Sequence, residues 1–549
     1  MNVQGALLEK RWPKTTGPVA RRRCLCAVNF FEFWQRNFKL TANFVSNARS
    51  NPATGIFARL EYEIVLLLCL LAVVHVFVFS AAFPLFVTTD EQFHLDLAVK
   101  YSHGDIPRSL NAPCAEVLPF LCMCGTPEYL MSPETYPNGR INPPLWTLPA
   151  DVIAPAYLAM ERMWKKATNT EASQPPVYYT LAGAWWRLGK ALGFQGVHLP
   201  YWLRFLNIFF VAGLVWLAYL AARRFFPENL FVRLGVPALI VFMPQTAFYS
   251  IENDVLSPLC FGAAFVLLMR WLQTDQPGAR LGALTGLALA ASFLTKTSNL
   301  PLLAASALAV LLKAWRLFKA KKLRAATPAL LSLAGCAGLP MAAWLAWCKI
   351  IFGDFTGSDA KIKFLGWIHK PFAEWWHHPI FTLHGFWIFL SGNLATLWQG
   401  EILWHRKPLA FPTVDLFYAI LSVGLVALAL VALFRRPAVT TTPQWQVLWF
   451  AFGCFAAALA FFGYLSIIYD FHDCFYPSRA HPYFTSGRLL LGALIPFLLL
   501  FVFGLDRALS GFGNSAKFLV LAVIMLFMLG SEIAIDWPIF PNVYNWFHL

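Results

Sequence analysis

Charged residues are scarce in this chain. Asp, Glu, Lys and Arg make up 13% of its 549 residues, whereas hydrophobic residues make up 58% and aromatic residues 16%. So little charge cannot cover the surface of several water-exposed domains, and this excludes a chain of soluble domains. The sequence also lacks a Walker motif, a dinucleotide-binding glycine pattern and a nucleophile elbow, so nothing in it indicates coupling to ATP hydrolysis. The composition instead predicts a polytopic membrane protein.

The sequence contains many long runs of apolar residues. Most are close to the roughly 17 to 25 residues that a membrane-spanning helix requires. The runs lie at 64–87, 205–222, 234–249, 254–272, 281–295, 300–318, 328–352, 413–434, 445–469, 487–505 and 516–536. We therefore expect an all-α polytopic fold of about eleven transmembrane helices. A further apolar stretch at 380–397 fits either a short span or a re-entrant helix.

The net charge of +15 is distributed in a way that indicates membrane orientation. Lys and Arg fall mainly in short segments that flank the apolar runs, and every short connection expected on the inner side is basic, as the positive-inside rule requires. Membrane orientation explains this charge better than a nucleic-acid partner does. We expect residues 1–62 to form a basic cytoplasmic segment, and residues 63–549 to form a transmembrane domain that begins with an uncleaved signal anchor. Residues 29–45 fit a helix on the membrane surface and a disordered basic tail about equally well.

With the N-terminus inside, two large loops lie on the outer side of the membrane, at 88–204 and 353–412. The first loop is rich in Pro, Tyr and Trp and contains semi-apolar stretches at 145–164 and 178–192. Aromatic side chains are stable at the boundary between lipid and water. We therefore expect these two stretches to form helices in the membrane interface.

Charged residues at the outer ends of the spans are informative, because ionisable groups near a bilayer are costly. Taken singly they have ordinary explanations: Asn253 or Asp254 caps a helix, Lys296 extends its amine to the interface, and Arg488 anchors a span. If they converge on one face, they supply a base and cations suited to a sugar-phosphate donor. His94 would share a helix face with Asp90. The residues in question are Asp90, Glu91, Arg204, Glu252, Asp254, Lys296, Lys349 and Arg488.

Cysteine and histidine give weaker signals. Cys114, Cys122, Cys124 and Cys474 fall on the predicted outer side, where an oxidising compartment would allow one or two disulfides. No cysteine pair is followed by the second pair of ligands that a zinc site needs, and the outer histidines show no ligand spacing. We therefore assign no metal site, and leave open a divalent ion that bridges a donor phosphate and acidic side chains.

Several short motifs together resemble a known superfamily. They are Asp90-Glu91-x-x-His94, Gly104-Asp105-Ile106-Pro107, Pro175-Pro176-Val177-Tyr178-Tyr179, Asn253-Asp254, Leu294-Thr295-Lys296 and Gly487-Arg488. In this order they resemble the GT-C superfamily, and more narrowly the bacterial membrane glycosyltransferases that use polyprenyl-phosphate sugars. That group includes protein mannosyltransferase-like and lipid A aminoarabinose transferase-like proteins, and segment 386–412 is similar to its uncharacterised polytopic relatives. The insertion at 111–142 departs from the pattern, so the acceptor is not inherited from the family.

The resemblance implies inverting transfer of a sugar from a lipid-phosphate donor, within a fold of many helices. Asp90 matches the catalytic base and Glu91 its neighbour. Lys296 and Arg488 match positions that face the donor phosphate, and we expect Arg204 to join them. Burial at the membrane edge and the charge of Glu91 would both raise the pKa of Asp90, which makes it a stronger base.

The remaining candidate residues surround this base. Asp254 matches a second acidic position that holds the acceptor or a metal ion in some relatives. We expect Glu252 and His94 to assist it. We also expect the tandem-proline motif to line the substrate, through Pro176, Tyr178 and Tyr179.

The sequence therefore predicts a glycosyltransferase of the cell envelope, in the bacterial inner membrane, with its active site on the periplasmic or outer face. Its partners would be membrane lipids, a polyprenyl-phosphate-linked sugar and an acceptor that is a protein, a lipid or a glycan. The main rival is a transporter or flippase of a lipid-linked or anionic substrate, which would place charges and broken helices near the membrane midplane. A structural or assembly subunit would need no paired acid and base. One shared outer cavity for Asp90, Asp254, Lys296 and Arg488 favours the transferase.

Overall fold

The computed structural model describes residues 52–129, 131–139, 141–435, 441–474 and 476–549. The predictions for residues 1–51, including the surface helix or tail at 29–45, lie outside this part of the chain. The expected boundary after residue 62 falls inside a single helix, α3 (Pro52–Ala82). The structure therefore has no break where the basic segment was expected to end.

Helices make up nearly all of the regular structure in the described residues, which confirms the predicted all-α polytopic class. In the described part of the chain, nine helical stretches are long and apolar enough to cross a membrane. They contain α3, α9 (Leu206–Phe225), α11 (Ser257–Gln273), α13 (Leu300–Lys319), α14 (Leu323–Phe352), α17 (Pro412–Arg435), α18 (Thr442–Ile468), α19 (Leu494–Ala508) and α20 (Asn514–Asp536). The other two predicted spans are shorter apolar helices, α10 (Leu230–Val241) and α12 (Ala279–Thr295). Every predicted apolar run therefore contains a helix. Helix α10 ends at Val241, although its predicted run continues to residue 249, and α12 covers the whole of its predicted run.

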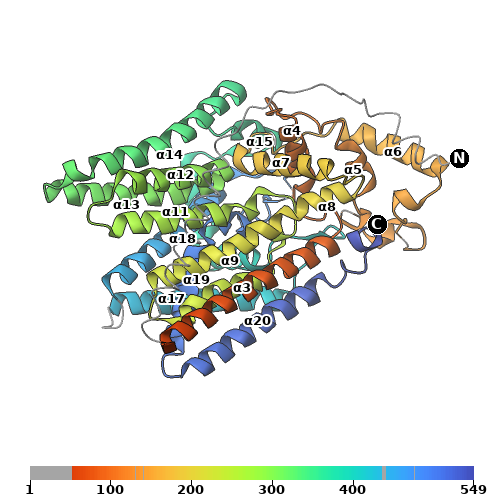
Figure 1. Ribbon diagram of the computed structural model, residues 1–549. Coiled ribbons are helices and arrows are strands. Elements are labelled where there is room, and N and C mark those ends of the chain that lie inside the picture. The colour runs from red at the N-terminus through yellow and green to blue at the C-terminus, as the bar shows by residue number, and fades with distance from the viewer. Residues whose placement is uncertain (1–51, 130, 140, 436–440, 475) are drawn as a thin grey trace.

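The spans run side by side, and the helices of the first large loop gather at one end of them (Figure 1). We call this the loop end. The helices there are α4 (Glu91–Ser102), α5 (Leu118–Met123), α6 (Ala150–Trp164), α7 (Pro176–Ala191) and α8 (His198–Arg204). Two of them, α6 and α7, occupy the stretches where interfacial helices were predicted. The C-terminus also lies at the loop end, where Asn542 hydrogen-bonds to Glu128 of the first loop.

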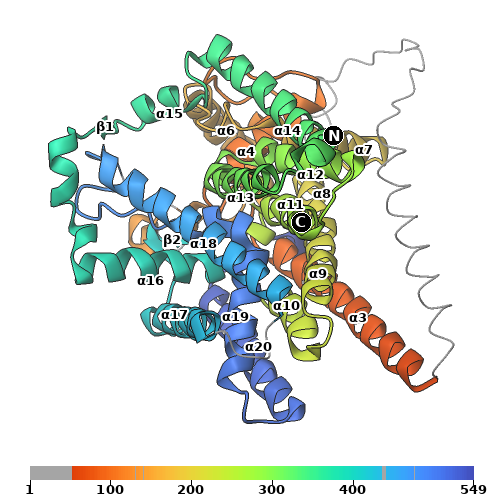
Figure 2. The same ribbon diagram turned by 90° about the vertical axis from the view of Figure 1, so that its left-hand side faces the viewer.

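The second large loop carries α15 (Ser358–Phe364) and α16 (Leu383–Gln399), which Figure 2 shows on the side of the bundle away from α3. Helix α16 is the stretch for which a short span or a re-entrant helix was predicted, and it packs against α17 and against η11 (Gly487–Ala493), the 3-10 helix that precedes α19. Among the residues that the structure describes, the strands form two short antiparallel pairs, β1 (Ile368–His369) with β4 (Tyr469–Asp470) and β2 (Leu403–Trp404) with β3 (Lys407–Pro408).

Short 3-10 helices connect the longer elements. They are η2 (Pro127–Tyr129), η3 (Pro133–Thr135), η4 (Pro137–Gly139), η5 (Leu145–Thr147), η6 (Thr246–Phe248), η7 (Asn253–Val255), η8 (Thr297–Asn299), η9 (Phe372–His377), η10 (Pro379–Phe381), η11 (Gly487–Ala493) and η12 (Trp546–His548). Two of them, η7 and η11, contain Asp254 and Arg488, and η8 directly follows Lys296.

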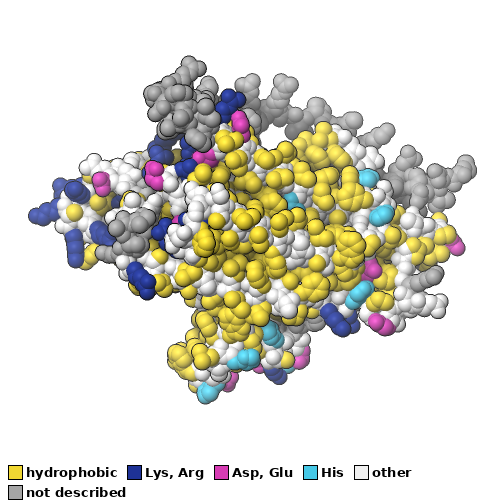
Figure 3. All heavy atoms as spheres, turned by 90° about the horizontal axis from the view of Figure 1, so that it is seen from below, with side chains coloured by type: hydrophobic (Ala, Val, Ile, Leu, Met, Phe, Trp, Pro, Cys, Tyr) yellow, Lys and Arg dark blue, Asp and Glu magenta, His cyan; other side chains and the backbone are white. Residues whose placement is uncertain are grey.

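The surface is divided by side-chain type. An apolar belt covers the middle of the face seen in Figure 3, and Lys and Arg gather at the end away from the loop end. This basic end includes the exposed turn between α13 and α14, with Lys319, Lys321 and Lys322. By the positive-inside rule, a basic end of this kind is expected in the cytoplasm.

Helix α19 forms the centre of the bundle. All of its residues from Leu494 to Asp506 are buried, and it packs against α10, α17 and α18. A helix that is apolar on all sides is stable only when other helices surround it. The turn η11 precedes α19 directly, so the loop end of the most buried span presents Arg488.

Candidate functional site

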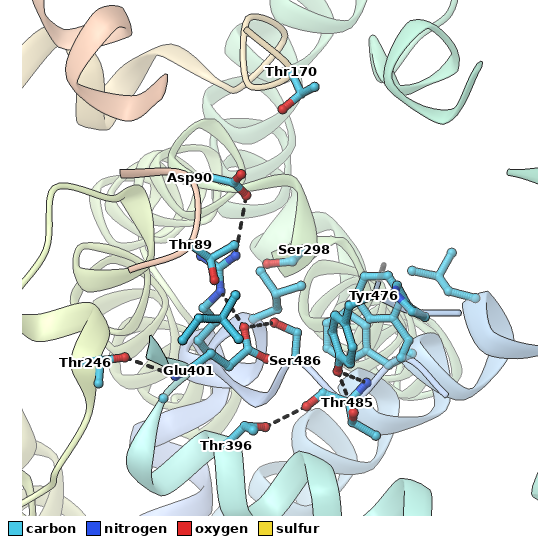
Figure 4. A pocket seen from close by; sticks show the side chains of 18 of the residues that line it. Thr89, Asp90, Thr170, Thr246, Ser298, Thr396, Glu401, Tyr476, Thr485 and Ser486 are labelled. Atoms are coloured by element: carbon cyan, nitrogen blue, oxygen red, sulfur yellow. Dashed lines mark hydrogen bonds and ion pairs between the residues drawn. The ribbon is translucent and has the colours of Figure 1, made fainter. Parts of the chain in front are cut away.

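A cavity of about 1320 Å³ opens at the loop end and collects residues from distant parts of the sequence. Asp90, His94, Lys296 and Arg488 all line it. Figure 4 shows Asp90 facing the cavity, with Glu401 and Ser486 on the other side of a shared cluster of hydrogen bonds and ion pairs. Four of the residues predicted from the sequence are thus brought together.

Asp90 lies at the start of α4 with an unusual backbone. Its φ of 64° is left-handed, and its side chain makes no capping hydrogen bond to the helix. Asp adopts this conformation more readily than most residues, and such strain clusters at functional sites. Because the carboxylate does not cap α4, it faces the cavity, where 27% of the side chain remains exposed and Oδ2 lies 3.8 Å from Nη2 of Arg488.

Arg488 is held by three further carboxylates. Its Nη1 lies 2.5 Å from Oε2 of Glu252 and 3.3 Å from Oδ2 of Asp254. Its Nε donates to Oε2 of Glu401 over 3.1 Å. Burial in this cluster raises the pKa of Glu252 to about 7, with the nearby Asp254 adding to the rise. The guanidinium is therefore fixed in direction by four acids, one of which takes up a proton near neutral pH.

Two glycines allow this arrangement. A Cβ atom on Gly487 would overlap the backbone of Asn393 in α16, so only glycine lets η11 approach that helix. Gly400 has φ +77° and passes just as close to Thr246, whose hydroxyl accepts the backbone N–H of Glu401 over 3.1 Å. Glycine therefore precedes Arg488 because no side chain fits at position 487.

Lys296 follows α12 and faces the same cluster. It pairs with Asp254 and donates to Oδ1 of Asn253 over 3.0 Å. Only 5% of the residue is exposed, yet it lines the cavity. Asp254 and Glu252 do not line the cavity themselves, and both contact Arg488 from within the protein. The acids predicted to assist an acceptor or a metal therefore hold the two cations in place.

A second ion pair borders Asp90. Glu171, in the loop before α7, pairs with Lys361 of α15 and accepts a hydrogen bond of 2.6 Å from Gln174. Burial disfavours the charge on Glu171, but Lys361 outweighs burial and holds the pKa of Glu171 well below its usual range. Burial of Asp90 raises its pKa, and the charge of Glu171 raises it further, while Lys361 acts in the opposite direction.

Sequence reasoning missed Glu171, Lys361 and Glu401, which line the cavity. All three lie in the two large loops, where acids and lysines are common. Glu171 is four residues before the tandem proline, and Glu401 follows a glycine at the end of an apolar helix. Neither position stands out without the fold.

His94 and Tyr179 form a pair behind Asp90. The Tyr179 hydroxyl lies 2.6 Å from Nδ1 of His94, and the backbone N–H of His94 donates to the Asp90 carbonyl over 3.1 Å. Burial lowers the pKa of His94 to about 3, so the ring is neutral at physiological pH. Tyr178 and Tyr179 are fully buried, and neither they nor Pro176 line the cavity. The predicted substrate-lining motif lies one layer behind the cavity wall.

Glu91 and Arg204 lie apart from the cavity. Arg204 donates to both carboxylate oxygens of Glu91, over 2.7 Å and 2.6 Å, and to three backbone carbonyls at the end of α3. Both side chains are completely buried. All of the guanidinium nitrogens are thus engaged in joining α3 to the first loop. The structure does not bring Arg204 to the position expected for donor binding, and Glu171, not Glu91, is the carboxylate that raises the Asp90 pKa.

Apolar side chains of the spanning helices form another part of the cavity wall. They come from the end of α12, the start of α13 and the last turns of α18. The residues are Phe293, Leu300, Phe461, Phe462 and Leu465. The charged cluster therefore shares one space with a surface suited to hydrocarbon.

Two predictions concern metals and disulfides. Among the described residues, no group of three or more His, Cys, Asp or Glu side chains is arranged to hold a metal ion. Cys114, Cys122, Cys124 and Cys474 are all free thiols. The disulfides that an oxidising compartment would allow are thus not formed between these four residues.

Comparisons with known proteins were made for the whole chain. No protein-family model and no curated protein matches it. Among solved structures, it is similar to ArnT from Cupriavidus metallidurans bound to undecaprenyl phosphate, with 12% identity and a TM-score of 0.42, over 88% of this chain and 74% of that one. It is also similar to the archaeal oligosaccharyltransferase AglB from Archaeoglobus fulgidus in complex with an inhibitory peptide and a dolichol-phosphate, with 12% identity and a TM-score of 0.40, over 87% of this chain and 56% of that one. Both likenesses are of overall fold, and they assign no role to any residue of this chain.

Proposed function

We propose that the protein is an inverting glycosyltransferase that moves a sugar from a polyprenyl-phosphate donor to a hydroxyl acceptor. The observation that carries the proposal is the shared cavity at the loop end. It combines a carboxylate, Asp90, with the cations Arg488 and Lys296, and it is lined in part by apolar side chains of spanning helices. Each feature matches one part of the proposed reaction. Asp90 would act at the reacting sugar, the two cations at the phosphate, and the apolar side chains at the hydrocarbon tail.

Asp90 would act as the base. In the proposed reaction the acceptor oxygen attacks the anomeric carbon from the side opposite the phosphate, so the new bond has inverted configuration. The Asp90 carboxylate takes the hydroxyl proton as the C–O bond to the phosphate breaks. Its raised pKa makes it a stronger base than an ordinary aspartate. General base catalysis of this kind contributes about 10² to 10⁴ in rate.

Arg488 and Lys296 would stabilise the departing polyprenyl phosphate. The phosphate gains charge as the glycosidic bond breaks, and preorganised cations stabilise that charge without reorganising during the reaction. Both cations are held from behind by Asp254. The prenyl chain would lie along Phe461, Phe462 and Leu465 of α18.

The location of the charges favours a transferase over a transporter. A transporter would place its charged site on broken helices near the membrane midplane. Asp90 precedes α4, Lys296 ends α12 and Arg488 lies in η11, all at helix ends that meet at the loop end. We place this end on the periplasmic or outer face of a bacterial inner membrane, with the N-terminus in the cytoplasm, because the opposite end is basic.

Asp90→Asn tests the proposal. Asparagine tolerates the left-handed backbone of Asp90, so the change removes the base with little effect on the local fold. Membranes containing the variant would be offered a labelled polyprenyl-phosphate sugar, and we expect transfer to fall about 100-fold or more. Asp105→Asn, at an exposed position of the same loop, is the matched control and should keep wild-type transfer. Near wild-type transfer by folded Asp90→Asn protein would refute the role of this residue.

A further inference from the structure

A second group of carboxylates lines the same cavity. Glu532 and Asp536 lie one turn apart at the end of α20, and Asp415 lies in the first turn of α17. Helices α17 and α20 are joined nearby by a 3.1 Å hydrogen bond between the hydroxyls of Tyr418 and Ser531. The proposed transfer reaction uses none of these three acids.

Two of the three acids have polar partners in the fold. Glu532 accepts a hydrogen bond from the Tyr249 hydroxyl, and its other oxygen lies 2.9 Å from Nε2 of His75. Asp415 accepts a hydrogen bond of 2.8 Å from the Gln399 side chain. These contacts explain the presence of Glu532 and Asp415 by their structural role, without a ligand.

Asp536 has no such partner. It is only 4% exposed, yet across the described part of the chain no hydrogen bond or ion pair reaches its carboxylate. It is the last residue of α20, whose final turn contains no basic side chain. The negative end of the helix dipole and the neighbouring Glu532 both disfavour a negative charge there. A carboxyl group that faces a cavity under these conditions favours its neutral form, and a cation bound beside it would favour the charged form.

We propose that Asp536 binds a primary ammonium group of the substrate. An ammonium group supplies one positive charge and three N–H donors, which match a single carboxylate beside a second acid. A divalent metal ion would need more oxygen ligands than this part of the wall offers. The inference rests on the proposed transferase function, since the amine belongs either to the donor sugar or to the acceptor.

Two pairs of compounds distinguish an amine on the donor sugar from an amine on the acceptor. The donor pair is farnesyl phosphate esterified with glucosamine or with glucose, and the acceptor pair is octyl glucosaminide and octyl glucoside. Binding to the purified full-length protein would be measured at neutral pH, where the amine is largely protonated and a carboxylate is less readily protonated than in acid. For one pair, we expect the amine compound to bind wild-type protein more tightly than its neutral partner. Asp536→Asn should weaken binding of that amine compound about tenfold and leave its neutral partner within about twofold.

Three controls make the result specific. Asp536→Glu keeps the charge and should retain the preference for the amine. Asp359→Asn removes an exposed carboxylate of the same cavity wall and should also retain it. Unchanged size-exclusion profiles would show that the variants are folded.

The outcomes distinguish the two proposals. If no amine compound binds wild-type protein better than its neutral partner, or if Asp536→Asn affects both members of a pair equally, the ammonium site is wrong. If neither farnesyl phosphate ester binds while octyl glucosaminide still depends on Asp536, the ammonium site stands and the polyprenyl-phosphate donor is wrong. Dependence confined to the donor pair would place the amine on the transferred sugar.

Discussion

Glu171 and Lys361 should move the pH dependence of sugar transfer in opposite directions. Both act on Asp90, and they carry opposite charges: Glu171 raises the Asp90 pKa and Lys361 lowers it. A base works only when it is deprotonated, so the rate rises with pH through its pKa. Removal of the negative charge in Glu171→Gln lowers that pKa, and the half-maximal rate moves to lower pH. Removal of the positive charge in Lys361→Met raises the pKa, and the half-maximal rate moves to higher pH.

The size of each displacement follows from the exposure of Asp90. A charge within about 4 to 6 Å changes a carboxyl pKa by roughly 1 to 3, or about 1.4 to 4 kcal/mol. Because 27% of the Asp90 side chain is exposed to the cavity, solvent screening reduces the effect to the low end of that range. We therefore expect each variant to displace the profile by about one pH unit. In Lys361→Met, the hydrogen bond from Gln174 keeps Glu171 in place. The charge of Lys296 still favours the ionised form of Glu171, so we expect its charge to continue to act on Asp90.

The assay is kcat measured across pH with donor and acceptor both saturating, so that binding does not contribute to the profile. Wild-type protein and the exposed variant Asp105→Asn should give the same profile. If the pH profiles of Glu171→Gln and Lys361→Met were displaced in the same direction, the electrostatic reasoning would be refuted. Unchanged profiles in two variants that still catalyse transfer would also refute it.

Three further predictions concern the neighbouring charges. Arg488→Ala should lower kcat/KM about tenfold or more when the donor is varied and less when the acceptor is varied, and equal losses would contradict donor binding. Glu91→Gln leaves Arg204 buried without its counter-ion, so thermal unfolding in detergent should show a loss of about 3 to 5 kcal/mol, and wild-type stability would contradict a structural pair. Glu252, with a pKa of about 7, is ionised above that pH and then holds Arg488 more strongly. The donor KM should therefore rise as pH increases through about 7 in wild-type protein and stay level in Glu252→Gln.

The membrane-spanning helices could be predicted because the signal is local. Most spans are runs of apolar residues long enough to cross a bilayer, and every run predicted here contains a helix in the structure. Sequence alone could not show that α10 ends at Val241, because its apolar run continues to residue 249. Nor could it show that α19 forms the buried centre while α13 and α14 lie at the edge, because all of these helices are apolar and their burial depends on their neighbours.

Site residues at the ends of apolar spans could be predicted from the sequence, because a charge is costly there. Site residues in polar loops could not, because charges are common there. Lys296 and Arg488 stood out because they end apolar spans. Glu171 and Lys361 lie in polar loops, where no local pattern separates them from ordinary surface residues. Asp90 and Glu91 are adjacent and chemically alike, yet the left-handed backbone at Asp90 directs its carboxylate into the cavity, while Glu91 begins α4 and faces Arg204. That difference depends on tertiary structure alone.

The geometry around Arg488 links donor binding to release of the base. Its contacts with Glu252, Glu401 and Asp254 range from 2.5 to 3.3 Å, whereas its contact with Asp90 is 3.8 Å. An incoming phosphate competes with the carboxylates for the same guanidinium, and it displaces the weakest and most exposed of them at least cost. Among the four that carboxylate is Asp90, with 27% of its side chain exposed against 20% for Glu401 and 2% or less for the other two. On the proposed function, donor binding would therefore separate Asp90 from Arg488, and the freed carboxylate would be a stronger base once the phosphate is in place.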